Sequence, residues 1–307
     1  MNEISKKRTH IEKRMLEWFK HKEKYSFTEP MEGLRSCPDT AEKNDLRLIS
    51  IEFESLQIWY LNVFVDSVLK GTPDYDVLAL NTRLGFTHFM MEHADYGIRP
   101  GNPGGYDAWN VDFLLCQLLS IGWHEQAEIV TRISIDEFNT FLGEGITTTK
   151  LPWFVLNLCR DWLGIETEIR SNWGDIYMPD LGFWEELLAG WREPNPHVFA
   201  ELFTKAADFH IEQSRYEDED KQDQREEPEI NNENYWLFPV ELFAVLRLRT
   251  WEGLDNPTLD HPLFSVSMLG KMPLLLTWPE NELLDEVERK YRRAYPEMKS
   301  FGTLPQS

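Results

Sequence analysis

The chain has 307 residues, of which 42% are hydrophobic, and it includes 12 Trp and 18 Phe. This apolar surface excludes a disordered acidic polypeptide, because its burial offsets the entropy lost when the chain becomes ordered. The 53 acidic residues exceed the 31 basic ones and leave a formal net charge of −22. Such a charge disfavours direct binding to nucleic acid or to an anionic membrane, and it favours a basic partner.

The cysteines and the N-terminus bear on where the protein works. Cys37, Cys116 and Cys159 are widely spaced and no CxxC pair occurs, which argues against a disulfide framework or a zinc site. The first residues, MNEISKKRTHIEKRMLEWF, start with positive charge but lack the apolar core of a signal peptide. No long apolar run occurs elsewhere, so we expect a cytoplasmic protein without membrane anchoring.

Most long segments have the apolar periodicity of helices. Apolar residues at helical spacing, followed by Gly71, predict one long helix over about 44–70, and a second helix is expected to end near Tyr96. The segment IRPGNPGGYDAW follows as a loop because it is rich in Gly and Pro. Further helices are expected at about 109–120, 123–142, 150–163 and 180–190.

Two more helices flank an acidic segment. One begins at Pro196 and carries a stripe of phenylalanines, and the other lies in NYWLFPVELFAVLRLRTW, which is apolar nearly all round. We expect the second helix to be buried, with Pro239 in its first turn. Between them, RYEDEDKQDQREEPEINNENYW holds nine acidic and three basic residues. Because the flanking helices should pack together, this segment is expected to be a solvated crossover, and whether it also meets a partner stays open.

Strand signals are weak throughout, since no alternating run is bounded by a two-residue glycine turn. We therefore predict an all-α, multi-helix domain. No repeat of 20–50 residues has a stable signature, although helix pairs could still stack irregularly. The expected division is an N-terminal helical region, 1–145, and a C-terminal helical region, 146–307, within one compact unit.

The segment THFMMEHADYG places His88, Glu92 and His93 close together and suggests a zinc hydrolase. Its spacing, HxxxEH, is neither HExxH nor HxxEH, so the two histidines point in different directions on a helix. A metal-dependent hydrolase built on these three residues is the alternative hypothesis for the function. The glycine-rich GNPGGY lacks the spacing of a phosphate-binding loop, and no recognisable nucleophile elbow is present. We therefore predict no catalytic residue, metal or cofactor, and hence no enzyme.

The segment NENYWLFPVELFAVLRLRTWEGLDNPTLDHPLF carries a further pattern. Its features are an aromatic pair, an acid in a buried helix and a Leu-Asp step before His-Pro: Tyr235, Trp236, Glu241, Leu254, Asp255, His261 and Pro262. On these residues it resembles the C-terminal domain of PoNi-type immunity proteins, which bacteria make against PoNe-type DNase toxins delivered by type VI and related secretion systems. The clear match covers about 30 residues. Pro239 and the bulkier helix depart from that pattern, which leaves open another immunity family paired with a different nuclease toxin.

The resemblance implies a catalytically inert, helical, cytoplasmic protein that binds a cognate toxin tightly and occludes its active site. Nucleases carry basic surfaces for phosphates, so an acidic inhibitor would gain fast, charge-steered association, with aromatic anchors adding affinity. A generic helical interaction scaffold is a further alternative, and the oligomeric state is not indicated.

Candidate toxin-binding residues follow from expected exposure. The first set consists of the loop acids Glu217, Asp218, Glu219, Asp220, Asp223, Glu226 and Glu227. The second set lies around the short helix near 180–190 and consists of Asp175, Asp180, Trp184, Glu185 and Glu186. We expect Tyr235, Trp236 and Glu241 to hold the fold instead, and Glu241 to need a polar partner if it is buried.

Overall fold

The computed structural model describes residues 3–20, 27–46, 48–96, 108–140, 149–169, 180–215, 228–258, 260–265 and 275–296. Within these ranges the chain forms α-helices and a short 3-10 turn and no β-strand, apart from an isolated bridge between Ser214 and Ile230. The all-α prediction is confirmed. Among the helices in these ranges, none combines the length and apolar character needed to cross a membrane.

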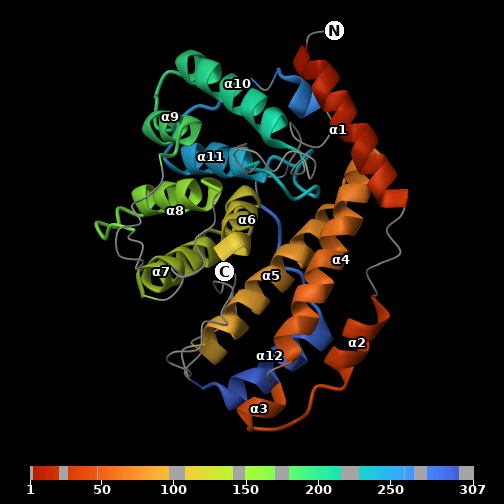
Figure 1. The fold of residues 1–307 in the computed structure, drawn as a ribbon. Helices are drawn as coiled ribbons and strands as arrows, with labels where there is room; N and C mark the ends of the chain where they lie inside the picture. The colour runs from red at the N-terminus through yellow and green to blue at the C-terminus, as the bar shows by residue number, and fades with distance from the viewer. Residues whose placement is uncertain are drawn as a thin grey trace, which may run out of the picture.

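A long helical hairpin forms one side of the molecule (Figure 1). It consists of α4 (Ile49–Leu69) and α5 (Tyr75–Tyr96), which pack along their length. Gly71 adopts φ 74°, a conformation that favours glycine, and it ends α4 as expected. The Asn81 side chain donates from Nδ2 to the backbone oxygen of Gln57 at 2.7 Å and ties the two helices together.

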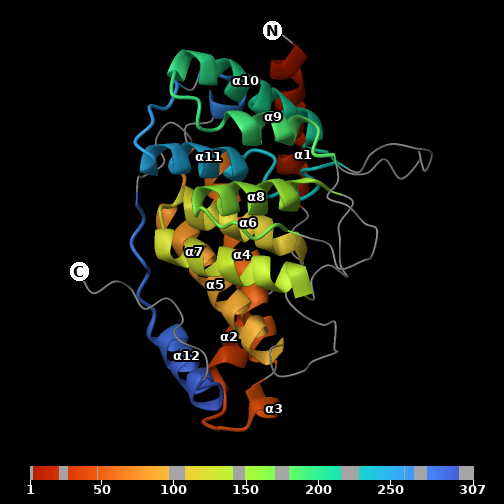
Figure 2. The same ribbon diagram turned by 90° about the vertical axis from the view of Figure 1, so that its left-hand side faces the viewer.

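The remaining large helices stack beside the hairpin in roughly parallel layers (Figure 2). They are α6 (Ala108–Ser120), α7 (His124–Thr140), α8 (Leu151–Trp162), α9 (Phe183–Gly190), α10 (Pro196–Gln213) and α11 (Val240–Trp251). The central helix α6 contacts α5, α7, α8 and α11. Helices α6 and α11 are apolar on most faces, and this composition matches their burial between neighbours.

Five further elements complete the fold in the described ranges. They are α1 (Glu3–Lys20), α2 (Thr28–Arg35), α3 (Lys43–Leu46), η2 (Pro262–Ser265) and α12 (Glu282–Ala294). No helix was expected for α1, α2 or α12, whereas the single helix expected over about 44–70 is recorded as α3 and α4. Helix α1 contacts α4, α10 and η2, and α2 lies between α4 and α12.

The segment that resembles the immunity family is largely buried. Glu241 is fully buried, and its polar partner is His210, whose Nδ1 lies 2.6 Å from Glu241 Oε1. The other ring nitrogen of His210 lies 3.1 Å from the backbone oxygen of Trp236. Trp236 donates from its indole nitrogen to the Ile230 oxygen at 2.8 Å. Pro239 lies at the cap of α11, just before its first turn, and not inside that turn as expected.

One buried hydrophobic cluster extends from Ile11 to Tyr295. Helix α6 belongs to the first expected region, and α8 and α11 belong to the second. Since α6 contacts both of these helices, the two expected regions pack against each other. Because these contacts are apolar and buried, they favour a single cooperative unit. The exact division into regions 1–145 and 146–307 stays a prediction.

Candidate functional site

The structure describes only part of the predicted toxin-binding surface. Asp175 and the seven loop acids between Glu217 and Glu227 lie outside the described residues. Asp180, Glu185 and Glu186 are described and exposed at the start of α9. The structure therefore offers a geometric account of the second set alone.

Trp184 is wrong as a contact residue. Its side chain is fully buried, and its ring stacks on Phe154 with centroids 4.7 Å apart. Phe209 packs against it edge-on at 5.2 Å. A ring enclosed in this way cannot reach a partner while α9 stays packed. The sequence could not separate it from Glu185, because adjacent helix residues diverge by about 100° and one faces inward while the other faces solvent.

The acids at the start of α9 have structural roles as well. Asp180 accepts a hydrogen bond at Oδ1 from the Gly182 nitrogen at 2.9 Å, which shapes the turn before the helix. Glu186 lies 3.8 Å from the Lys205 ammonium, and both side chains are exposed. Carboxylates in a first turn also interact favourably with the helix dipole. These acids form a small acidic edge of the surface.

His88, Glu92 and His93 do not form a metal site. His88 is buried on α5, where its Nδ1 lies 2.9 Å from the Ser50 oxygen of α4. Burial lowers the pKa of His88, and the nearby Glu54 carboxylate offsets part of that change. Across the described ranges, no group of three or more His, Cys, Asp or Glu side chains is arranged to hold a metal ion. The alternative hypothesis therefore lacks a ligand set among these residues.

The three thiols are all free and buried. Burial raises the pKa of Cys159 to about 12 and the pKa of Cys116 well above its ordinary value. Burial also raises the pKa of Cys37, although Lys290 opposes that change. Because the thiolate is the nucleophilic form, none of these cysteines is poised to attack a substrate.

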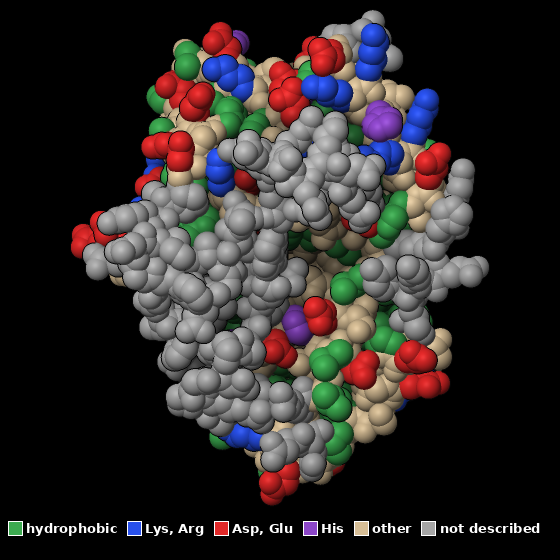
Figure 3. Space-filling model, in the orientation of Figure 1, with side chains coloured by type: hydrophobic (Ala, Val, Ile, Leu, Met, Phe, Trp, Pro, Cys, Tyr) green, Lys and Arg blue, Asp and Glu red, His purple; other side chains and the backbone are tan. Residues whose placement is uncertain are grey.

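A cavity of about 230 Å³ opens between the hairpin and the stacked helices. Side chains from α1, α4, α5, α6 and the turn before α11 line it, and they are Trp18, Glu54, Gln57, Ile58, Leu61, His88, Phe113, Asn232, Glu233, Asn234 and Tyr235. The space-filling view shows a hollow at the centre of this face, with a histidine and acidic side chains beside it (Figure 3). This cavity is the candidate functional site.

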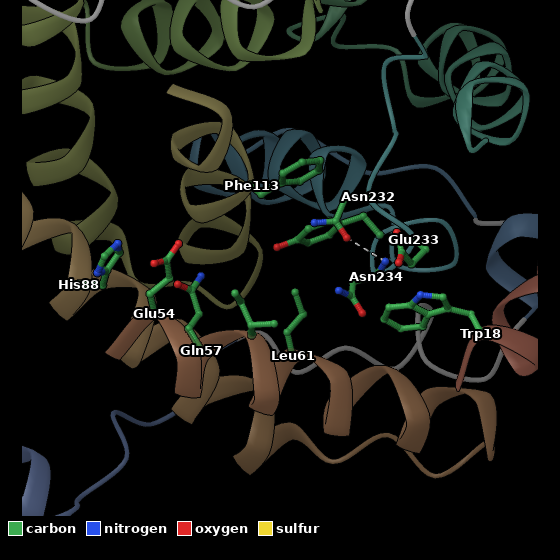
Figure 4. Close-up of a pocket in the computed structure, with 11 residues that line it drawn as sticks. Trp18, Glu54, Gln57, Leu61, His88, Phe113, Asn232, Glu233 and Asn234 are labelled. Carbon is green, nitrogen blue, oxygen red and sulfur yellow. Dashed lines mark hydrogen bonds between the residues drawn. The ribbon is translucent and has the colours of Figure 1, made fainter. Parts of the chain in front are cut away.

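The polar residues gather at two ends of the cavity (Figure 4). His88, Glu54 and Gln57 lie together at one end, where α4 and α5 meet. Glu233 and Asn234 lie at the other end, beside Trp18 (Figure 4). Each end thus combines a carboxylate with a side-chain amide.

The turn before α11 is rigidly held. The Asn234 nitrogen donates to Asn232 Oδ1 at 3.0 Å, and the Tyr235 nitrogen donates to the Asn232 backbone oxygen at 3.0 Å. The Tyr235 ring stacks on Phe113 with centroids 3.9 Å apart and planes within 3° of parallel. Gln117 donates to the Tyr235 hydroxyl at 3.0 Å. The Glu233 and Asn234 side chains are therefore presented from a fixed backbone.

The cavity is rich in hydrogen-bond acceptors. It contains two carboxylates, Glu54 and Glu233, and neither forms an ion pair with a lysine or arginine in the described part of the chain. Asn234 is 7% exposed, and its Oδ1 is a buried acceptor without a hydrogen-bond partner among the described residues. Such an acceptor costs free energy until a donor reaches it. The arrangement of acceptors suits binding of a cationic donor.

Sequence reasoning missed most of this site. It selected His88 for metal chemistry and Tyr235 for packing, and both line the cavity. Glu54, Gln57 and Glu233 carried no signal, because they belong to segments about 180 residues apart in the sequence. The Asn-Asn-Glu-Asn run at 231–234 is typical of a turn, and that feature alone could have marked this corner.

Asp112 precedes the cavity residue Phe113 in α6. It is buried and accepts from the Phe113 nitrogen at 2.7 Å. Burial raises its pKa well above 3.8, despite the opposing backbone hydrogen bonds. The folded state therefore favours the protonated form of Asp112. The stability that this form contributes is present at low pH, and it is lost as the pH rises from about 4 through the raised pKa of the folded state.

We expect Asp112→Asn to be more stable than the wild type at pH 8.5, because the amide cannot ionise. Between pH 5 and 8.5, the stability of this variant should also decline less than that of the wild type. Urea unfolding followed by tryptophan fluorescence measures this. Glu125→Gln, at an exposed position of α7, controls for the loss of one acid. Identical pH profiles for the wild type and Asp112→Asn would contradict the assignment.

The described part of the chain is thus an all-α protein with a small cavity that is lined by acidic and aromatic side chains. Comparison with protein-family models, with curated proteins and with solved structures finds no match.

Proposed function

We propose that the protein is an immunity protein, which binds a cognate antibacterial toxin and occludes its basic active-site surface, and that the toxin is a nuclease. The observation that carries the proposal is an acidic binding surface on a protein with a net charge of −22. Its described parts are the cavity acids Glu54 and Glu233 and the edge acids of α9. A basic, phosphate-binding surface is the natural complement of such a surface.

The residue pattern of the C-terminal segment adds support. In this chain the acid Glu241 and the aromatic Trp236 meet at His210, and Tyr235 reaches the cavity. The pattern that resembles PoNi-type immunity proteins therefore lies in the turn that carries Glu233, whereas Glu54 comes from α4. This gives the resemblance a physical basis: the buried residues hold a binding surface in place.

The test begins with the neighbouring genes: where one of them encodes a basic, nuclease-like domain, that domain is co-expressed with this protein. We expect growth to be protected, and the two purified proteins to form a one-to-one complex. Raising the salt concentration from 50 to 500 mM should weaken the complex at least tenfold, because exposed charges are screened. Calorimetry or surface plasmon resonance measures the affinity.

Variants then locate the surface. Glu185→Lys with Glu186→Lys, and replacement of the seven loop acids from Glu217 to Glu227 by amides, should each slow association. Lys70→Gln, at an exposed position at the end of α4, is the control that changes charge without removing an acid. If inhibition survived the loss of every exposed acidic cluster, the electrostatic proposal would be wrong.

A further inference from the structure

We propose that the cavity between α4, α5, α6 and the turn before α11 is a receptor for one arginine side chain of the protein partner. That this arginine belongs to a toxin rests on the proposed function. The preference of the cavity for a guanidinium group rests on the lining of the cavity alone. The bound arginine would anchor the partner at this cavity.

The first reason is the balance of donors and acceptors. The two carboxylates, Glu54 and Glu233, offer acceptor oxygens at opposite ends of the cavity, and Asn234 Oδ1 adds a buried acceptor without a partner in the described chain. No lysine or arginine is among the described residues that line it. A guanidinium group has five donors and no acceptor, so it matches this lining and an anion does not.

The second reason is the aromatic wall. Phe113 and Tyr235 form one stacked pair at the cavity, and Trp18 closes the end next to Glu233 (Figure 4). Planar guanidinium groups stack on aromatic faces, and the attraction grows when water is excluded. The walls Ile58 and Leu61 can pack against the aliphatic stem of an arginine.

The third reason is size. The cavity volume of about 230 Å³ is below the roughly 300–1,000 Å³ that is typical of pockets for whole small-molecule ligands. It is suited to one long side chain that enters from a surface. Anchors of this kind, with arginine prominent among them, carry much of the affinity in protein complexes.

A metal ion is a weaker match for the same acids. The described residues bring together no three metal-ligating side chains, and the two carboxylates lie at different ends of the cavity. A compact ion could engage one end only. An extended cation, with a charged head and a stem, spans the aromatic wall as well.

The first experiment measures binding of N-acetyl-arginine-N-methylamide to the full-length chain by NMR or calorimetry. We expect a dissociation constant on the order of 1 mM. The citrulline analogue has nearly the same shape without the charge, and it should bind at least about tenfold more weakly. Equal binding of both compounds, or no binding of either, would overturn the proposal.

Variants assign the binding to the cavity. Glu233→Gln should weaken binding of the arginine amide about tenfold or more, since it removes a charge-assisted contact at the end where Asn234 and Trp18 lie, and Glu54→Gln, at the other end, should weaken it less. Glu201→Gln, at an exposed position of α10, is the matched control and should leave binding unchanged. Unchanged unfolding midpoints show that the two cavity variants remain folded. Equal loss in all three variants would indicate a diffuse charge effect and contradict the cavity.

The second experiment separates the partner from a free small molecule. The arginine amide at 50 mM should compete with a toxin domain identified by the co-expression test, and Glu233→Gln should speed dissociation of that complex about tenfold. Arginine-dependent binding without competition would mean that a free small cation is the ligand, and would overturn the partner's role. If the amide binds as expected but no toxin complex forms, the proposed immunity function fails and cation recognition by the cavity stands.

Discussion

Replacement of Arg83 by Met is expected to lower the free energy of unfolding by about 3–5 kcal/mol. Arg83 projects from α5, and its side chain is 0% exposed. It donates to Asp285 Oδ1 at 2.6 Å, to Glu288 Oε1 at 2.9 Å and to the Pro279 oxygen at 2.7 Å. Met fills similar space but provides no donor, so the substitution leaves the Glu288 carboxylate buried beside an apolar side chain.

The consequence should concentrate on α12. Glu288 has only the Thr87 hydroxyl, 3.1 Å away, as a second described donor. Burial raises the pKa of Glu288 even in the presence of Arg83, which shows how strongly the site disfavours an unpaired carboxylate. We therefore expect limited proteolysis of Arg83→Met to cut first within residues 275–296, because α12 loses its main polar attachment to α5.

A double variant separates the effect of the Arg83–Glu288 ion pair from the effect of packing around Arg83. Arg83→Met with Glu288→Met removes both charges, and it should recover at least half of the stability lost in the single variant. Urea unfolding midpoints give the comparison. If the double variant were as unstable as the sum of the two single variants, the loss would come from packing around Arg83 and not from the stranded carboxylate.

Arg249→Met should produce the second large effect, a loss of about 3–4 kcal/mol. Arg249 lies in the last turn of α11, and its guanidinium donates to the backbone oxygens of Trp191 at 2.6 Å, Glu193 at 2.9 Å and Asp255 at 2.7 Å. It also stacks over the Phe199 ring at 3.7 Å. One side chain thus satisfies carbonyls from two loops, and Met would leave them without these donors.

The matched control is Arg132→Met. Arg132 lies on α7, and its side chain is 54% exposed and pairs, among the described residues, only with Glu128 of the same helix. An exposed pair within one helix contributes about 0.3–0.5 kcal/mol, so this variant should be nearly neutral. Thermal unfolding of both variants provides the measurement. A loss below about 1 kcal/mol in Arg249→Met would show that the loops are held by packing alone.

Both arginines show how this acidic protein uses its scarce basic residues. Arg83 and Arg249 are fully buried, where they satisfy carboxylates and carbonyls inside the fold. The candidate cavity, by contrast, keeps its acids without a lysine or arginine partner in the described chain. Under the proposed function, these two carboxylates are the ones that face a partner's arginine beside the aromatic side chains of the cavity.

Local features of the sequence determined the helical class and most of the long helices. The start of α10 at Pro196 was predictable because a proline at the first helical position follows Asn195, whose side chain accepts from the His197 nitrogen at 3.0 Å. The burial of α11 was predictable because its sequence is apolar nearly all round. The need of Glu241 for a polar partner also followed from burial, although the partner, His210, did not.

Only the tertiary structure decided where the candidate site lies. Glu54 and Glu233 have no local feature in common, and they line one cavity because the hairpin, α6 and the turn before α11 pack together. The sequence around Trp184 is compatible with a place on the surface or in the core. In the structure, its ring packs against Phe154 in the core. Periodicity and turn chemistry act over a few residues, whereas a binding cavity depends on contacts between segments far apart in the chain.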